Sequence, residues 1–205
     1  MKILSFLLSF ILFATITNKI YSQTRYKDPR DGQVYKIVKI GNQIWFAENL
    51  NYKTTNSWCY NNSSSNCATY GRLYDWNSAL IACPDGWHLP NENEWTILES
   101  YVDSKYEVSN NEWNKWGLRG YDCGDKLKSV KGWHSSGNGI DFYGFKVLPG
   151  GCREWNGSNF NSVKKIAFFW LSDKCWYRAL GYNHNMIYRF KYDCNYGYSV
   201  RCLKN

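Results

Sequence analysis

The chain has 205 residues, a formal net charge of +8 and an aromatic content of 19%, with 11 Trp and 17 Tyr. Its basic residues are scattered and form no basic helix or Arg-rich arm, so no nucleic-acid partner is expected and the charge indicates a solvated surface. Several aromatic rings should be partly exposed, because a small domain has room for few fully buried Trp side chains.

The first residues have the pattern of a secretory signal peptide. Lys2 precedes an apolar run from Ile3 to Ile16, and small or polar residues follow as far as Ser22. A basic start, a short apolar region and a small residue near the end are typical of such a leader. A membrane anchor is the alternative, but the run is shorter than the roughly 20 apolar residues that span a bilayer.

We therefore expect a signal peptide over residues 1–22 and one domain over residues 23–205, with no membrane span after cleavage. No cysteine precedes Cys59, so this cleavage leaves no N-terminal cysteine for a lipoprotein-type acyl group. Loss of Lys2 and Lys19 leaves 23 Lys and Arg against 17 Asp and Glu, a net charge of +6. A mild attraction to acidic polysaccharide or cell envelope fits this balance.

Cysteine usage points to an oxidising compartment. The count of eight is even, which in an exported protein indicates a disulfide framework. A zinc site is disfavoured because there is no Cys-x-x-Cys, and no Cys or His stands at ligand spacing from His88, His134 or His184. We expect no metal and no cofactor.

The N-terminal third predicts a hairpin and a clipped loop. After a polar lead-in over 25–30, residues 34–40 form an expected strand, Gly41-Asn42 a turn, and residues 43–47 the partner strand. The polar run 60–66 has no periodicity and is expected to be a loop. Cys59 and Cys67 bracket it, and we expect a Cys59–Cys67 disulfide.

Two helices are expected next, on either side of a short extended piece. Residues 75–82 read as a helix with Asp75 or a neighbour as its cap, and Pro84 ends it. Residues 87–89 are extended because Leu89 precedes a proline. Asn91 with Glu94 three residues later predicts a capping box. Apolar residues then repeat at helical spacing: Trp95, Leu98 and Val102.

The second half reads as loops and strands. A helical turn is expected over 125–130 and a structured Gly-rich loop over 132–144. The expected strands cover residues 145–148, 167–172, 176–180, 186–192 and 198–203, with a turn at 182–185 between the third and fourth. Strands, two helices and then loops with strands predict an α+β fold, not a βαβ repeat.

The motifs in this order resemble the Fibrobacter succinogenes major paralogous domain, a family of exported bacterial domains without an established activity. The resemblance covers nearly the whole expected mature chain. The matching segments are Asp31-Gly32-Gln33-Val34-Tyr35, Ile40-Gly41-Asn42-Gln43-Ile44-Trp45, Glu48-Asn49-Leu50, Tyr70-Gly71-Arg72-Leu73-Tyr74, Cys83-Pro84-Asp85-Gly86-Trp87-His88-Leu89-Pro90, Glu94-Trp95, Gly144-Phe145, Leu148-Pro149-Gly150-Gly151, Phe169-Trp170-Leu171-Ser172 and Ser199-Val200-Arg201-Cys202.

That family in turn resembles a C-type-lectin-like fold of the branch near formylglycine-generating enzymes. The resemblance implies two helices packed on a small, mostly antiparallel sheet with long, disulfide-stapled loops. It also implies a Cys83–Cys202 disulfide, and it puts His88 where formylglycine-generating enzymes have Arg. For the other four cysteines we favour Cys123–Cys152 and Cys175–Cys194, although eight cysteines allow 105 connectivities and the sequence does not decide among them.

Catalytic and metal chemistry have weaker support. Formylglycine-generating enzymes use cysteines near the C-terminus, but this chain lacks their Cys-x4-Cys pair, and Cys202 matches a structural position. Calcium needs 6–8 oxygen ligands, and the nearest lectin-like segment, Glu154-Trp155-Asn156-Gly157, lacks a second acid. Glycoside hydrolysis would need two facing carboxylates, and no pair can be assigned. We expect no catalytic residue.

Aromatic binding remains as the best-supported kind of site. Flat rings beside amide donors suit a sugar face or an extended peptide, and the C-terminal half is rich in both. Trp170 is expected in the core. Trp176 and its neighbour should face opposite ways on a strand, so one of the two should be exposed. The expected ligand-binding residues are Trp155, Asn156, Trp176, Tyr177 and Tyr182.

The sequence thus favours an exported, non-catalytic binding module, secreted, periplasmic or on the cell surface of a bacterium, with a glycan or cell-envelope polymer as ligand. The first alternative is a structural or adhesive surface protein with a protein partner. The second is an enzyme related to formylglycine-generating oxidases. We place the function in the loops between Gly132 and Asp193, and the segment from Cys83 to Trp95 in the scaffold.

Overall fold

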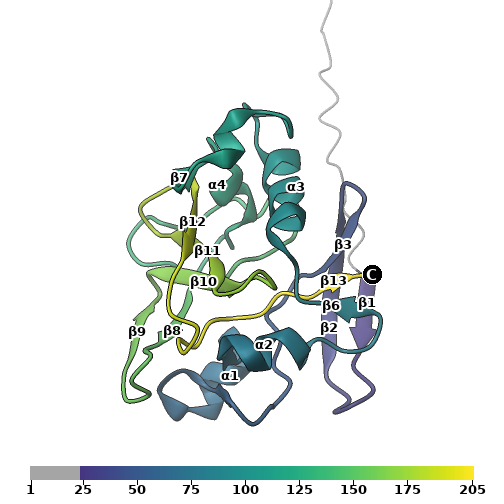
Figure 1. The fold of residues 1–205 in the computed structure, drawn as a ribbon, viewed down its shortest axis with the longest axis vertical. Helices are drawn as coiled ribbons and strands as arrows, with labels where there is room; N and C mark the ends of the chain where they lie inside the picture. The colour runs from purple at the N-terminus through teal and green to yellow at the C-terminus, as the bar shows by residue number, and fades with distance from the viewer. Residues whose placement is uncertain (1–23) are drawn as a thin grey trace, which may run out of the picture.

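A computed structural model describes residues 24–205 as a mixed α+β fold with few helices and mostly antiparallel sheets. The expected signal peptide and its cleavage point lie outside the described residues. Figure 1 shows two sheets beside each other, with α3 (Glu92–Val102) and α4 (Cys123–Leu127) at one end and α1 (Ser64–Tyr70) and α2 (Trp76–Ala82) at the other. Across residues 24–205, none of the helices has the length and apolarity to cross a membrane.

One sheet joins the two ends of the described chain. Its strand order is β1-β2-β3-β13-β6, with bounds Thr24–Lys27, Val34–Ile40, Gln43–Phe46, Leu203–Lys204 and Trp87–His88. The predicted hairpin is confirmed, because β2 pairs with β3 in antiparallel register around Gly41, which has a φ of +59°. The lead-in over 25–30 contains an unpredicted edge strand, β1, whose polar composition hides its pairing with β2.

The second sheet has the order β7-β12-β11-β10-β8-β9. A meander of β10, β11 and β12 forms its centre and confirms the hairpin expected around residues 182–185. Two further strands, β4 and β5, pair separately. The bounds are β7 Gly117–Arg119, β12 Ile187–Lys191, β11 Trp176–Gly181, β10 Ile166–Trp170, β8 Gly150–Arg153, β9 Phe160–Val163, β4 Ser57–Trp58 and β5 Leu73–Tyr74.

Two predicted strands are wrong in extent. Residues 145–148 form only one bridge, between Val147 and Lys128, because Lys146 has a left-handed φ of +55°; the strand β8 lies just beyond them. Of residues 198–203, only Leu203 belongs to a strand. Tyr198 and Ser199 instead bridge to β5 and β10, so this segment crosses from one sheet to the other.

The helices begin where local chemistry predicts. Asp75 accepts a hydrogen bond from the Ser78 backbone N–H at the start of α2. Asn91 and Glu94 form the full capping box of α3. The loop expected over 60–66 is wrong, because it contains a 3-10 turn, η1 (Tyr60–Asn62), and the first part of α1. A second 3-10 turn, η2 (Asn111–Asn114), precedes β7, and the helical turn predicted over 125–130 is α4, two residues earlier.

Aromatic side chains build two core clusters. The clusters lie on opposite faces of β10, since Phe169 belongs to one and its neighbour Trp170 to the other. Trp45, Trp95 and Trp170 are fully buried, which confirms Trp170 as a core residue. In contrast, Trp116 and Trp155 are 56% and 60% exposed.

Buried ion pairs hold α3 against the second sheet. Glu99 is fully buried and accepts from Arg178 Nε at 2.5 Å and from Arg119 Nε at 2.8 Å. Glu92 pairs with Arg178 and Arg189. Burial raises the pKa of Glu92, but the hydrogen bonds and charges of these two arginines outweigh it and hold the pKa below its usual value. This network of two Glu and three Arg was not foreseen from the sequence.

Three of the expected disulfides are present: Cys59–Cys67, Cys83–Cys202 and Cys175–Cys194. The expected Cys123–Cys152 bond is wrong, and both residues are free, buried thiols. The physical reason is that Cys123 packs in one core cluster and Cys152 in the other, on opposite faces of the sheet. Burial raises the pKa of Cys152 to about 12 and that of Cys123 well above its usual value, so both stay protonated at neutral pH.

Thiol counting tests this pairing. We expect the folded, unreduced protein to leave Cys123 and Cys152 unreactive toward a thiol reagent, because both are buried and protonated. Unfolding without reductant should expose two thiols per chain. A count of zero thiols would show that Cys123 and Cys152 are bonded after all. A count above two would show that one of the other three disulfides is absent.

Glu99→Gln tests the buried charge network. Removing this carboxylate leaves the buried Arg119 guanidinium without its close carboxylate partner and leaves Arg178 with Glu92 alone, so we expect the free energy of unfolding to fall by about 3–5 kcal/mol. Urea denaturation measures the change. The exposed Glu107→Gln is the matched control, expected within about 0.5 kcal/mol of the parent. Equal effects of the two substitutions would show that the network contributes nothing to the free energy of unfolding.

Candidate functional site

The aromatic residues expected to bind ligand do not form one site. Trp155 and Asn156 lie between β8 and β9, where the Trp155 ring stacks on no other ring of the described residues. Trp176 and Tyr177 begin β11, and Tyr182 follows its other end, where its ring meets His134 edge-on at 5.2 Å. The five residues are therefore spread over the second sheet.

The expectation that Trp176 or Tyr177 is exposed is wrong, because neighbouring rings half-bury both side chains. Trp176 packs against one core cluster and contacts Trp116, with ring centres 5.0 Å apart. Tyr177 lies on the other face of β11 and packs against Tyr198 at 5.0 Å. Burial raises the pKa of Tyr177 to about 12, which keeps it neutral.

In the Glu154–Gly157 segment, the carboxylate forms hydrogen bonds within the β8–β9 hairpin. The two Glu154 oxygens accept hydrogen bonds from the side-chain amides of Asn159 and Asn161. Within residues 24–205, no three His, Cys, Asp or Glu side chains gather as metal ligands would.

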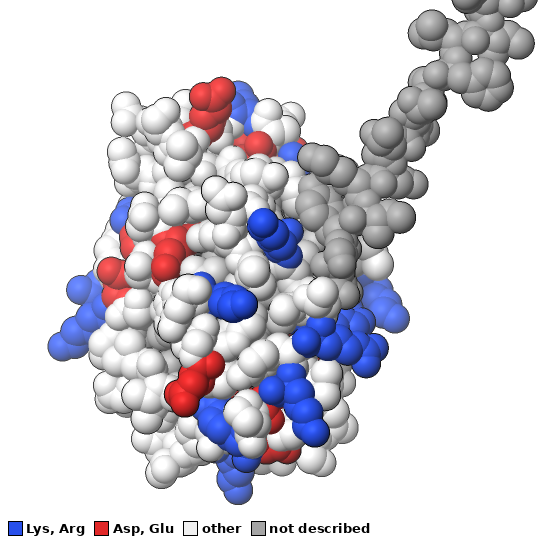
Figure 2. Space-filling view, turned by 90° about the vertical axis from the view of Figure 1, so that its right-hand side faces the viewer, with Lys and Arg blue, Asp and Glu red and all other residues white. Residues whose placement is uncertain are grey.

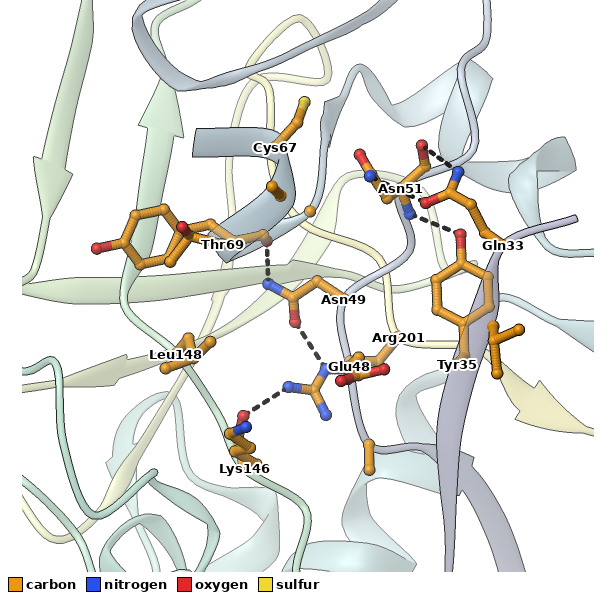
Figure 3. A pocket seen from close by; sticks show the side chains of 15 residues that line it. Gln33, Tyr35, Glu48, Asn49, Asn51, Cys67, Thr69, Lys146, Leu148 and Arg201 are labelled. Carbon is orange, nitrogen blue, oxygen red and sulfur yellow. Dashed lines mark hydrogen bonds between the residues drawn. The ribbon is translucent and has the colours of Figure 1, made fainter. Parts of the chain in front are cut away.

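A hollow lies instead between α1, β2 and the segment after β3, with a cavity volume of about 330 Å³. Figure 3 shows that its walls come from parts of the chain far apart in sequence. The lining residues are Gln33, Val34, Tyr35, Ala47, Glu48, Asn49, Asn51, Cys67, Ala68, Thr69, Tyr70, Gly71, Lys146, Leu148 and Arg201. We call this hollow the amide pocket.

Helix α1 forms one wall of the amide pocket and is fixed at its middle and at its C-terminus. The Cys59–Cys67 disulfide ties it to the preceding chain. At its C-terminus the Asn49 side chain donates to the Tyr70 carbonyl at 2.8 Å. Gly71, with a φ of +74°, lies so close that a Cβ would stand 2.7 Å from the Asn49 Cβ. The close approach of α1 to residues 49–50 therefore requires glycine at this position.

A side-chain amide network forms the opposite wall (Figure 3). Asn51 Nδ2 donates to Gln33 Oε1 at 3.0 Å, and Gln33 Nε2 donates to the Asn51 carbonyl at 3.2 Å. The Tyr35 hydroxyl accepts from the Asn51 backbone N–H. Asn51 Oδ1 is buried without a hydrogen-bond partner among the described residues. A buried acceptor of this kind is stabilised by any hydroxyl that reaches it.

Arg201 forms the floor of the pocket. Its Nε–H donates to Asn49 Oδ1 at 2.7 Å, and its Nη1 and Nη2 groups donate to the backbone carbonyls of Phe46, Phe145 and Lys146. These four bonds use four of its five N–H donors and leave one on Nη2. Burial lowers the pKa of Arg201 to about 9, so the guanidinium stays protonated at neutral pH.

The charges that line the pocket are not balanced. Glu48 is the single carboxylate, and its Oε2 accepts from the Lys36 backbone N–H at 3.0 Å. Arg201 and Lys146 are cations, and within residues 24–205 neither has a carboxylate within 4.0 Å. The lining residues therefore offer fixed donors and a surplus of one positive charge, while the half-buried Asp141 carboxylate acts on both cations from outside the lining.

Sequence reasoning missed this pocket. The sequence patterns give Asn51 no role and Asn49 only a place in a family motif, although two amides within three residues after a strand are a usable signal. Lys146 and Arg201 could not be placed there, because only the tertiary fold brings them to residues 49–51. The pocket also draws on loops before Gly132, outside the region where function was expected.

Comparison with known proteins gives one match. The sequence model of the Fibrobacter succinogenes major domain matches residues 38–204, a span that includes most of the pocket lining. No curated protein and no solved structure matches the chain.

Gly71→Ala tests how closely α1 must approach residues 49–50. We expect it to lower the free energy of unfolding by about 1–3 kcal/mol more than Gly86→Ala does. Both glycines have a positive φ, but a Cβ at Gly86 would meet nothing within 4 Å. The difference between the two variants, measured by urea denaturation, isolates the packing contact. Equal losses would show that α1 has room to shift.

Proposed function

The chain belongs to the Fibrobacter succinogenes major domain family, and we propose that it is an exported, non-catalytic binding module whose amide pocket takes an acidic glycan or cell-envelope polymer. The C-type-lectin-like fold and the signal peptide are part of this proposal. The three disulfides are compatible with an extracellular protein.

The observation that carries the proposal is the set of polar groups that the fold holds in place without using them fully. One Arg201 N–H, the Lys146 ammonium and Asn51 Oδ1 have no partner among the described residues, while their neighbours are fixed by hydrogen bonds. Donors and acceptors fixed in this way suit hydroxyl and carboxylate groups, because the side chains lose little conformational freedom on binding.

Charge favours an acidic ligand. The surplus cation of the pocket lies at its buried floor, where a carboxylate is screened less than at the surface. Figure 2 shows Lys and Arg spread over the face of the five-stranded sheet with Asp and Glu between them, not a continuous basic strip. Selectivity for an acid would therefore come from the pocket and not from the whole surface.

Catalysis has less support in this geometry. The pocket lining has one carboxylate, whereas glycoside hydrolysis uses two. Cys175, Cys194 and Cys202, the cysteines that an oxidase of the formylglycine-generating kind would draw on, are all in disulfides. The remaining thiols are buried and protonated, unlike reactive thiolates.

A glycan array that includes uronic-acid polymers and purified envelope polymers tests the proposal. We expect binding to acidic glycans that is unchanged by a chelator. Lys146→Gln should weaken it by about tenfold, because a charge-assisted hydrogen bond contributes roughly 1.5–3 kcal/mol. Lys131→Gln is the matched control, since Lys131 is an exposed lysine outside the pocket lining.

Two outcomes would contradict the proposal. One is an array with no acidic glycan or envelope polymer bound. The other is equal binding by the Lys146→Gln and Lys131→Gln variants. Binding to a protein component alone would favour the adhesive alternative.

A further inference from the structure

A second hollow, of about 420 Å³, lies at the N-terminal end of α3 and shares no lining residue with the amide pocket. It is formed between α3, η2 and the strand β12, next to the edge strand β7. Its lining residues are Asn91, Glu92, Asn93, Thr96, Trp113, Asn114, Asp173 and Arg189. Most of these side chains carry hydrogen-bonding groups.

An exposed aromatic platform is linked to this second hollow through Arg189. The Trp116 ring is 56% exposed and stands edge-on to Trp176 at 5.0 Å and to Phe190 at 5.7 Å. The Arg189 guanidinium lies over the Trp176 ring at 4.5 Å and also lines the hollow. The rings and the hollow are therefore continuous through Arg189.

The polar groups of the hollow are already held in position. Arg189 donates to Glu92 and to the Asn114 carbonyl. Asp173 Oδ2 accepts from the Glu92 backbone N–H at 2.6 Å, which leaves its second oxygen available. Asn93 is adjacent and its side-chain amide makes no hydrogen bond within the described residues. Both donors and acceptors thus surround the hollow.

Charges at this hollow balance, unlike those of the amide pocket. The three carboxylates of the hollow and the network behind it are Glu92, Glu99 and Asp173. They face three arginines, Arg119, Arg178 and Arg189. A charged ligand therefore gains little net electrostatic attraction in this hollow. A neutral polar ligand can form hydrogen bonds to the fixed groups without leaving a charge unpaired.

We propose that the platform and hollow together form a second ligand subsite, which binds a neutral sugar ring. The apolar C–H face of the sugar lies on Trp116, since C–H groups suit the negative face of an aromatic ring. Its hydroxyls bond to Asp173, Asn93 and Arg189, because a hydroxyl both donates and accepts. This subsite rests on the proposed glycan-binding function but uses different residues.

A peptide is the competing occupant, since Trp116 directly precedes the edge strand β7. An extended peptide would add to that edge through backbone hydrogen bonds. The strand has only three residues, Gly117–Arg119, and Arg119 is fully buried. So short an edge offers few bonds, and the geometry favours a sugar.

The two exposed tryptophans of the described chain provide a matched test. Titrations of the full chain use neutral gluco-, xylo- and manno-oligosaccharides, followed by calorimetry and tryptophan fluorescence. We expect saturable binding by at least one series, and Trp116→Ala should weaken it by about tenfold or more, as for a central aromatic contact. Trp155→Ala should leave it unchanged, because Trp155 is similarly exposed but belongs to the β8–β9 hairpin, whereas Trp116 contacts the Trp176 ring that Arg189 covers.

Trp116→Phe guards against a folding artefact, since a smaller ring should give an affinity between those of the parent and Trp116→Ala. Absence of binding by every neutral series, equal affinity of the Trp116→Ala and Trp155→Ala variants, or Trp116-dependent binding of a peptide alone would each overturn the subsite. Acidic-glycan binding that depends on Lys146 would still support the amide pocket in those cases. Conversely, Trp116-dependent sugar binding without any effect of Lys146 would support this subsite and reject that pocket.

Discussion

The guanidinium of Arg201 lies fully buried among oxygen atoms from two distant parts of the chain. It bonds to Asn49 and the Phe46 carbonyl after β3, and to the carbonyls of Phe145 and Lys146 in the loop before β8. Burying a charge is costly unless its donors are satisfied. The first hairpin, the 141–148 loop and the C-terminal segment must therefore assemble together, and the amide pocket forms where they meet.

The protein buries arginines in two different ways. Arg119 and Arg178 meet the carboxylates of α3, so their charges are neutralised in place and no charge is left for a ligand. Arg201 meets neutral oxygens and keeps its charge. Arginine thus holds α3 against the second sheet through ion pairs, and it supplies a positive charge at the floor of the amide pocket. We read the two hollows as chemically distinct for this reason.

Local patterns in the sequence predicted the elements whose causes are local. The Gly41 turn, the Asp75 and Asn91 caps and the β11–β12 hairpin all follow from neighbouring residues. The errors occur where distant residues decide: Lys146 adopts a left-handed φ because Arg201 and Asp141 hold its backbone, and Cys123 is separated from Cys152 by a sheet. The pocket was missed for the same reason, and the exposure expected of Trp176 or Tyr177 was wrong because rings from distant elements half-bury both.

The disulfides differ in how soon each can close as the chain emerges. Cys59 and Cys67 are 8 residues apart, whereas Cys83 waits for Cys202, 119 residues later. Synthesis runs from the N-terminus, so the Cys59–Cys67 bond can close early, while the Cys83–Cys202 bond closes only with the C-terminal segment. Arg201 precedes Cys202 by one residue, and so the late bond also locks the pocket floor. Formation of the pocket floor and completion of the oxidised fold are thereby tied to the same final step, and a chain stalled before it would lack the pocket and be open to proteases.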